Sequence, residues 1–379
     1  MFDDDARRAR TGGLRREDEG PFPDLEHLRP EHAGRSAPEQ QPDHDDGRDE
    51  ADAEQREQIR ELYESFEHDI PETFNIATYV CDRWDTVKGR TALYAETEEG
   101  EESVHTFGDL SERSNRLANY LASVGVGRGD RVAVTGTQKP ETLVTILATW
   151  KMGAISVPVS AMEGTKGLSY RLIDAGVSVV VADESNVDAY RDCQADCGTV
   201  LVVDTAPEGT ERAFEEVLAS HSSKFETVET DAEDPALIIY TSGTTGDPKG
   251  VVHAHRVLPG HLPGFVFKHM NMEVADDDVI WVIAEWSWIG LVAFILPALF
   301  YGLPVVGYAR TSFKPESVFR MIEKYEISVT SLPPSVVRML QAEADPDRYD
   351  LDSIRALSSG SEKVSQSVFE WLKEVFDNP

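Results

Sequence analysis

Residues 240–253 of the 379-residue chain read Tyr-Thr-Ser-Gly-Thr-Thr-Gly-Asp-Pro-Lys-Gly-Val-Val-His, and they follow the apolar run Ala236-Leu237-Ile238-Ile239. The apolar run is typical of a buried strand that ends where the small residues begin. Glycines let the backbone turn tightly and come close to a ligand. Exposed N–H and hydroxyl groups along such a turn form a concavity suited to anionic oxygens. Together with the positive charge of Lys249, the pattern predicts a loop that holds phosphates.

This loop does not have the Walker A pattern, in which glycine, four further residues and then Gly-Lys-Ser/Thr follow one another. Counted from Gly243, that spacing places Pro248 where the second glycine belongs, and Gly250 follows the lysine. The alternative is a flexible surface loop, because Gly, Ser, Thr and Pro are common in ordinary turns. The ordered ten-residue pattern favours the phosphate loop.

The chain is strongly acidic, with 36 Lys and Arg residues against 69 Asp and Glu residues and a net charge of −33. This balance argues against nucleic acid or an anionic membrane as the main partner. Such a surface resembles that of halophilic proteins, in which charge keeps the molecule soluble; an ordinary acidic cytosolic protein is the alternative. Three cysteines at irregular spacing, and no signal-peptide pattern, favour a reducing, cytoplasmic location.

The composition divides the chain into two parts. Residues 1–55 contain few large apolar side chains and are predicted to be a disordered acidic extension. Residues 56–379 form the predicted domain, which opens with a helical pattern over 59–85. Strands are predicted at 91–94, 103–107, 131–134, 155–159, 177–182, 199–203, 236–239, 279–283, 303–308, 327–332 and 354–358. Helices are predicted at 141–152, 166–175, 316–323, 334–342 and 365–376, and Asp109 or Ser111 is expected to cap another helix that contains Leu117 and Leu121.

Continuous Val and Ile runs that alternate with helices indicate mostly parallel sheets covered on both faces. Two α/β layers, split near residues 220–235, are therefore expected. The uncharged stretch from Ser287 to Ala309 is long enough to cross a bilayer. Pro297 and Gly302 interrupt it, so a buried helix followed by a buried strand is expected instead of a membrane span.

The motif from Thr241 to Val251 resembles the signature of the acyl-adenylate-forming enzymes, which include acyl-CoA synthetases, luciferases and peptide-synthetase adenylation domains. The resemblance covers about residues 57–379. Residues 71–77, 128–134, 332–335 and 359–362 are similar to the acetyl- and medium-chain acyl-CoA synthetase branch. The resemblance implies an α/β fold of two doubly wound subdomains, the family's large domain, truncated before its C-terminal domain.

In that family the glycine-rich loop clamps the triphosphate of ATP while a carboxylate attacks the α-phosphorus. The resemblance assigns this role by position to Thr241, Ser242, Gly243, Thr244, Thr245, Gly246 and Lys249, with Thr244 and Lys249 as the catalytic pair. It also places Gly360, Ser361 and Glu362 along the adenine. The alternative for residues 359–361 is a plain strand-to-helix turn in which Ser361 caps the helix.

The resemblance aligns residues 285–290 with the border of the acyl pocket, whose predicted wall includes Trp288, Ile289 and Val292. Apolar side chains suit an aliphatic acid. Amino-acid-activating relatives place an aspartate in this region, and none lies between Glu285 and Ala309. The alternative is that these residues are ordinary core. His253 and His255, beside the loop, are expected to be structural.

The implied function is that of an AMP-forming acyl-CoA synthetase, which joins a short- or medium-chain acid to CoA through an acyl-adenylate. ATP, CoA and Mg²⁺ are the implied cofactors, and no membrane or nucleic-acid partner is expected. The family's Tyr-Gly-x-Thr-Glu motif, whose glutamate helps to hold Mg²⁺, is absent from this chain. The alternative is an inactive nucleotide-binding remnant, or a subunit that needs a separate C-terminal part.

Overall fold

The computed structural model describes residues 60, 69–193, 198–241, 247–343 and 345–376. Contacts divide the chain into one unit that ends at Pro71 and a second that runs from Glu72 to Pro379. The fold described below is that of the second unit. The predicted disordered extension, residues 1–55, lies outside the described residues.

Seven strands form the first sheet, in the spatial order β7-β6-β5-β3-β4-β8-β9. Neighbouring strands are parallel except β8 and β9, which form an antiparallel hairpin. Their bounds are β3 (Arg131–Thr135), β4 (Ile155–Val159), β5 (Val179–Asp183), β6 (Thr199–Val203), β7 (Arg212–Ala213), β8 (Pro235–Thr241) and β9 (Lys249–Ala254). The chain leaves β3 toward β4 and leaves β5 toward β6, so the strand order reverses between β3 and β5.

Six strands form the second sheet, in the order β13-β12-β10-β11-β1-β2. These strands are also parallel, apart from the antiparallel pair of β1 and β2 at one edge. Their bounds are β1 (Thr91–Thr97), β2 (Glu102–Thr106), β10 (Ile280–Val282), β11 (Val305–Ala309), β12 (Val329–Ser331) and β13 (Ala356–Ser358). Strands of both sheets are buried on both faces, as the Val and Ile runs predict.

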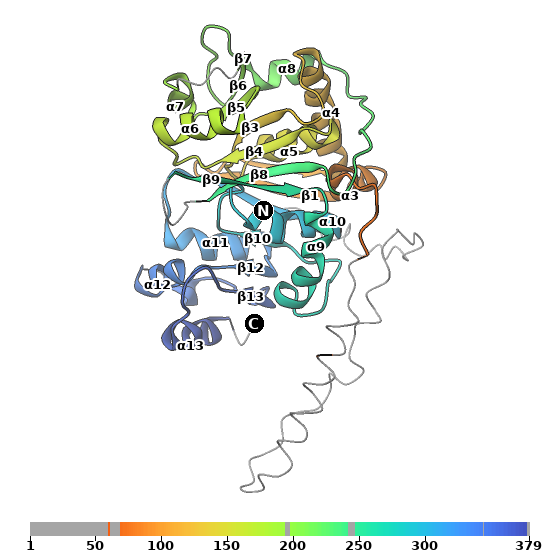
Figure 1. Ribbon diagram of the computed structural model, residues 1–379. Coiled ribbons are helices and arrows are strands. Elements are labelled where there is room, and N and C mark those ends of the chain that lie inside the picture. The colour runs from red at the N-terminus through yellow and green to blue at the C-terminus, as the bar shows by residue number, and fades with distance from the viewer. Residues whose placement is uncertain (1–59, 61–68, 194–197, 242–246, 344, 377–379) are drawn as a thin grey trace, which may run out of the picture. The chain divides into compact units, whose positions relative to one another are not determined.

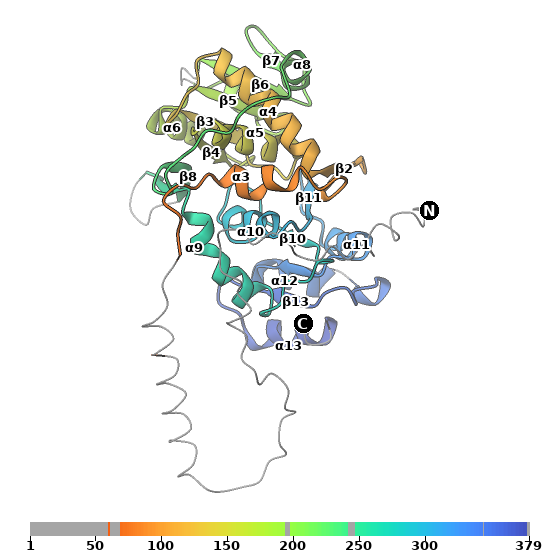
Figure 2. The same ribbon diagram turned by 90° about the vertical axis from the view of Figure 1, so that its right-hand side faces the viewer.

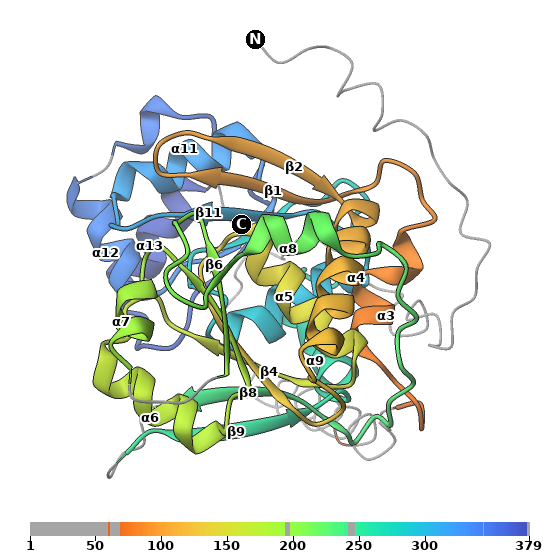
Figure 3. The ribbon, with the colours of Figure 1, turned by 90° about the horizontal axis from the view of Figure 1, so that it is seen from above.

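Helices cover both faces of each sheet. On the first sheet, α4 (Phe107–Ser123), α5 (Pro140–Lys151) and α8 (Phe214–Ser220) lie on one side, and α6 (Thr165–Ala175) and α7 (Val187–Arg191) lie on the other (Figure 3). On the second sheet, α11 (Pro315–Tyr325), α12 (Pro334–Glu343) and α13 (Gln366–Val375) lie opposite α9 (Val257–Gly264) and α10 (Leu296–Phe300) (Figure 1). The short helix α3 (Ile76–Val80) lies next to α10 and α5 (Figure 2).

Within the described ranges, the remaining helical segments are single turns. η4 (Phe265–His269) continues α9 and η5 (Leu291–Ile295) precedes α10, and both are π-helical. The 3₁₀ turns are η3 (Asp82–Trp84) and η6 (Pro346–Arg348). π-Helical turns are rare and are often found at functional sites.

The predicted α/β class with mostly parallel sheets is confirmed, but three local predictions differ from the structure. The start of α4 is capped by Thr106, not by Asp109 or Ser111. The Thr106 hydroxyl accepts from the Asp109 N–H at 3.1 Å, and the Asp109 carboxylate accepts from the Thr106 N–H at 2.8 Å. This reciprocal capping box starts the helix at Phe107, which the apolar alternation had assigned to a strand.

The chain changes sheet twice, because β1 and β2 belong to the second sheet and β3 to β9 belong to the first. The second change falls after β9, between residues 254 and 280, whereas the predicted split lay near residues 220–235. It comes later because β8 and its hairpin partner β9 complete the first sheet. The helical pattern over 59–85 becomes the short α3 and η3 in its described part. Residues 59 and 61–68 lie outside the described residues.

The uncharged stretch from Ser287 to Ala309 forms η5, α10 and then strand β11, all largely buried. The expected buried helix followed by a strand is therefore confirmed. Within the ranges that the structure describes, no helix combines the length and apolar character that crossing a membrane requires.

Candidate nucleotide and acyl site

The glycine-rich stretch is the connection of the β8–β9 hairpin. Thr241 pairs with Lys249 at the end of this hairpin where the loop connects the two strands, and both side chains are exposed. The two ends of the predicted phosphate loop are thereby brought side by side. Ser242, Gly243, Thr244, Thr245 and Gly246 lie outside the described residues, so their role in binding phosphate stays a prediction.

Tyr240 fixes this hairpin to the first sheet's helical layer. Its hydroxyl donates to Asp174 Oδ2 at 2.7 Å on α6, and burial together with this carboxylate raises the pKa of the phenol, which stays neutral. On the facing strand, a Cβ on Gly250 would lie 3.2 Å from the Tyr240 ring and 3.0 Å from Ile238. Glycine at position 250 therefore lets the two strands close over the tyrosine.

The segment 359–362 follows β13 at the carboxyl edge of the second sheet. Ser359 Oγ donates to the Leu332 carbonyl at 2.8 Å, which ties the segment to the end of β12. Gly360, Ser361 and Glu362 are all exposed. A hydrogen bond from Ser335, and then the Arg338 guanidinium 2.9 Å away, lower the pKa of the Glu362 carboxyl.

The alternative role of Ser361 as a helix cap is wrong. Helix α13 is capped by Ser365, whose hydroxyl accepts from the Val368 N–H at 3.3 Å. Ser361 instead has a φ of +69°, in the left-handed region that favours glycine. The backbone here has the conformation that glycine adopts most readily.

Ser361→Gly is expected to raise the free energy of unfolding by about 1 kcal/mol, because it removes the left-handed strain of a non-glycine residue whose side chain is exposed. Ser359→Gly is the matched control: it removes the hydrogen bond to Leu332 and should lower stability by about 1 kcal/mol. Urea unfolding of both variants measures the effects. Equal destabilisation by the two substitutions would contradict the strain at position 361.

The predicted acyl wall divides into an exposed and a buried part. Trp288 and Ile289 are 47% and 50% exposed, whereas Val292, on η5, is fully buried. The Val292 N–H donates to the Ile289 carbonyl at 3.0 Å, so Trp288 and Ile289 lie directly before η5. The structure thus brings Trp288 and Ile289 to the surface at the carboxyl edge of the second sheet and places Val292 in the core.

His269 is a residue of this region that the sequence did not indicate. Its ring lies 4.0 Å from the ring of Phe294 on η5, and its Nδ1 lies 3.2 Å from Ser358 Oγ at the end of β13. Burial, followed by the nearby Lys268 charge, lowers its pKa to about 4. A neutral imidazole therefore joins the aromatic face of η5 to the strand that leads to residues 359–362. No local sequence pattern indicated His269, because the residues that it contacts lie far from it in the sequence.

His255 has no exposed surface, and its Nδ1 accepts from the Ile76 N–H at 3.2 Å. Burial lowers its pKa to about 4, so it is neutral in the folded protein. These features fit the structural role expected of it. Among the described residues, no group of three or more His, Cys, Asp or Glu side chains could hold a metal ion.

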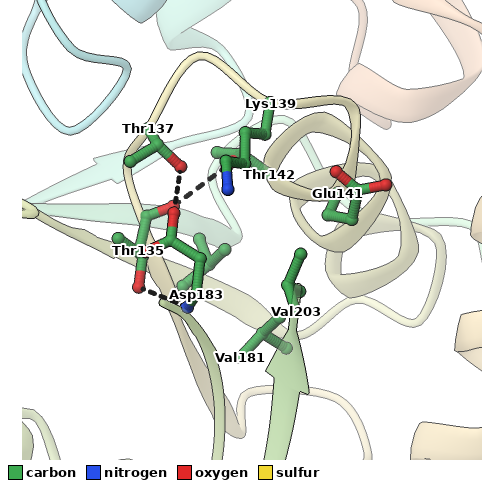
Figure 4. A pocket seen from close by; sticks show the side chains of 9 residues that line it. Thr135, Thr137, Lys139, Glu141, Thr142, Val181, Asp183 and Val203 are labelled. Carbon is green, nitrogen blue, oxygen red and sulfur yellow. Dashed lines mark hydrogen bonds between the residues drawn. The ribbon is translucent and has the colours of Figure 1, made fainter. Parts of the chain in front are cut away.

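A small pocket lies at the carboxyl edge of the first sheet, where the strand order reverses between β3 and β5 (Figure 4). Open α/β sheets often bind ligands at such a point. Its lining residues are Val134, Thr135, Thr137, Lys139, Glu141, Thr142, Val181, Asp183 and Val203. The charged groups are already paired: Lys139 with Glu184 at 2.6 Å, and Asp183 with the Thr137 hydroxyl at 2.6 Å.

Comparison with known proteins gives this geometry its context. The family model described as "AMP-binding enzyme" matches residues 82–379. An acetyl-coenzyme A synthetase of Campylobacter jejuni is 30% identical over 332 residues, which cover 79% of this chain and 49% of the relative. An uncharacterized acyl-CoA ligase of Bacillus subtilis is 26% identical, over 81% of this chain and 57% of the relative.

Among solved structures, an acyl-CoA synthetase of Brucella canis superposes with a TM-score of 0.74 at 27% identity, over 83% of this chain and 57% of the other. The chain spans about half the length of the curated acetyl-coenzyme A synthetases that it matches. The match extends over both sheets, including the β8–β9 hairpin of the first, as the resemblance implied. The chain belongs to the AMP-binding enzyme family.

Proposed function

We propose that this chain supplies the ATP- and acid-binding part of an AMP-forming acid–thiol ligase, which activates a short- or medium-chain carboxylic acid and transfers it to CoA. The observation that carries the proposal is the β8–β9 hairpin, which holds Thr241 and Lys249 at either end of the glycine-rich loop. Membership of the family, whose relatives include acetyl-coenzyme A synthetases and acyl-CoA ligases, supports it. A cytoplasmic location is part of the proposal.

In this proposal the hydroxyl and N–H groups of residues 241–246 bind the β- and γ-phosphates. Lys249 neutralises charge that develops on the pyrophosphate when the acid's carboxylate attacks the α-phosphorus. Such a reaction depends on positioning and on neutralising oxygen charge, with little covalent help from the protein. Mg²⁺, when bound, would reduce the negative charge of the phosphates.

The acid would lie against Trp288 and Ile289 at the carboxyl edge of the second sheet. Their apolar surface favours an aliphatic acyl group. Gly360, Ser361 and Glu362 come after β13 at the same carboxyl edge of the sheet, and the adenine is proposed to lie along them. Val292 is buried in the core. We therefore propose that it contributes to the pocket by packing η5 against the core.

Lys249→Ala is expected to weaken ATP binding by about tenfold or more, because it removes a charge-assisted contact to phosphate. The fold should not change, since Lys249 is exposed. Calorimetry with ATP and Mg²⁺ measures the affinity, at one fixed salt concentration because the chain's net charge of −33 repels the nucleotide when screening is weak.

The control is Lys88→Ala, which removes another exposed lysine outside the hairpin. A common loss in both variants would indicate a general charge effect and not a phosphate site. Unchanged ATP affinity in Lys249→Ala would count against the proposed function itself.

The match to the AMP-binding family model is also consistent with a second candidate, a nucleotide-binding remnant or subunit. In that case the chain binds nucleotide but needs a further polypeptide for turnover. Acid-dependent exchange of labelled pyrophosphate into ATP separates the two candidates. Exchange by the purified chain alone supports the enzyme, whereas ATP binding without exchange supports the second candidate.

A further inference from the structure

The connection between β3 and α5, residues 136–139, joins the first sheet to the second. The Gly136 N–H donates to the Val159 carbonyl of β4, and the Gly136 carbonyl accepts from the Trp286 N–H; both distances are 2.8 Å. Gly136 also lies directly against Ser287, because a Cβ at this glycine would approach the Ser287 Cβ to 2.5 Å. This connection therefore contacts the segment that leads into Trp288.

Gln138 is the centre of this contact. Its Nε2 donates to the carbonyls of Val282 and Ala284, each at 2.7 Å. Its Oε1 accepts from Trp281 Nε1 at 3.2 Å and from the Tyr308 N–H at 3.0 Å. Both N–H donors and both oxygen lone pairs of the amide are thus used, and only 4% of the residue is exposed.

The neighbouring side chains hold the same connection from the other direction. Thr137 Oγ1 donates to Asp183 Oδ2 at 2.6 Å (Figure 4). Lys139 Nζ lies 2.9 Å from Asp204 Oδ2, in addition to its pair with Glu184. Thr137 and Lys139 thus bond to residues on the side of the first sheet, whereas Gln138, between them, bonds to the second sheet. The two flanking contacts hold Gln138 in place. A side chain held in this way also fixes the positions of its hydrogen-bond partners.

We propose that Gln138 is a positioning residue for the acyl site. It fixes the carbonyls of Val282 and Ala284, and so sets the direction in which the chain leaves β10 toward Trp288 and Ile289. Gln138 does not itself contact the acid, since it is buried and its amide is fully bonded. The inference rests on the proposed function for the identity of the acid, but the positioning itself is a property of the chain.

The experiment compares wild type, Gln138→Met and Gln138→Asn with Gln366→Met, an exposed control glutamine on α13. Methionine keeps the volume of the side chain and removes its four hydrogen bonds. Amide hydrogen exchange over residues 282–289 reports the positioning directly, and urea unfolding identifies variants that fail to fold. The expected result for Gln138→Met is exchange at least tenfold faster in this segment, with residues 131–135 of β3 unchanged.

Calorimetry with linear acids of two to eight carbons, in the presence of ATP, gives the functional readout. The expected result is acid binding weakened about tenfold and a flatter dependence on chain length, with ATP affinity within twofold of wild type. Gln138→Asn, which retains the amide but is shorter, is expected to lie between Gln138→Met and wild type.

Unchanged exchange over residues 282–289 in Gln138→Met would overturn the inference, as would equal loss of acid and ATP affinity in a folded variant. If the wild-type chain binds neither ATP nor acid, the proposed function fails. Hydrogen exchange then still decides whether Gln138 positions this segment, so the two failures are distinguishable.

Discussion

The Gly136→Ala variant is expected to lose about 3 kcal/mol of its free energy of unfolding, a loss typical of severe overpacking. The added Cβ would lie 2.5 Å from the Cβ and 2.7 Å from the backbone nitrogen of Ser287. Neither backbone can withdraw easily, because the Gly136 N–H and carbonyl are hydrogen bonded to Val159 and Trp286. The methyl group therefore forces the two sheets apart at this point.

Gly260→Ala is the matched control. Gly260 lies in α9, and nothing is found within 4 Å of the position of its added Cβ. Since alanine favours helices over glycine by up to about 1 kcal/mol, this variant should be as stable as wild type or more so. Urea unfolding followed by circular dichroism measures both variants, and equal midpoints would show that the close contact of Gly136 with Ser287 does not exist.

The elements that the sequence predicted best are those whose pattern arises from local burial. Helices α11 and α13 were predicted because each has one apolar face, and β3, β4 and β6 because strands covered on both sides consist of apolar residues. Strand β9 was not predicted. Most of its side chains are exposed, so it has no apolar alternation and is defined by its pairing with β8.

Non-local pairing also explains why the division into sheets was hard to predict. Strand β1 lies parallel to β11, so Leu93 pairs with Val305, more than two hundred residues later. No local pattern in residues 91–106 indicates that this hairpin belongs to the sheet formed by the second half of the chain. Sequence order alone therefore suggested a boundary that the spatial order of the strands does not follow.

The candidate site shows the same difference. Lys249 could be proposed from the sequence because the glycine-rich motif is continuous in sequence and distinctive in spacing. Gln138 and His269 could not, because their partners lie far along the chain: Gln138 bonds to Val282 and His269 to Ser358. A polar residue in an unremarkable segment gains its role only when the fold surrounds it.

Asp278→Ala is expected to lower the free energy of unfolding by about 3 kcal/mol, because removing one partner of a buried ion pair leaves the other charge uncompensated. Asp278 is 1% exposed and lies just before β10. Both of its oxygens bond Arg355, with Arg355 Nε at 2.6 Å from Oδ1, and Oδ1 also accepts from Ser328 Oγ at 2.8 Å. The carboxylate thus joins the amino ends of three strands, β10, β12 and β13.

Asp277→Ala is the control for charge alone, since it removes a neighbouring exposed carboxylate and should change stability by less than about 0.5 kcal/mol. A double-mutant cycle with Arg355→Met separates the ion pair from the other contacts of Asp278. If the pair is coupled, the double variant should be more stable than the sum of the two single losses predicts, by about 1 kcal/mol or more. Additive losses, measured by urea unfolding, would instead assign the stabilisation to the hydrogen bonds from Ser328 and from the Ala275 N–H at 2.8 Å. The comparison therefore decides whether the ion pair or the uncharged hydrogen bonds to Asp278 hold this end of the second sheet.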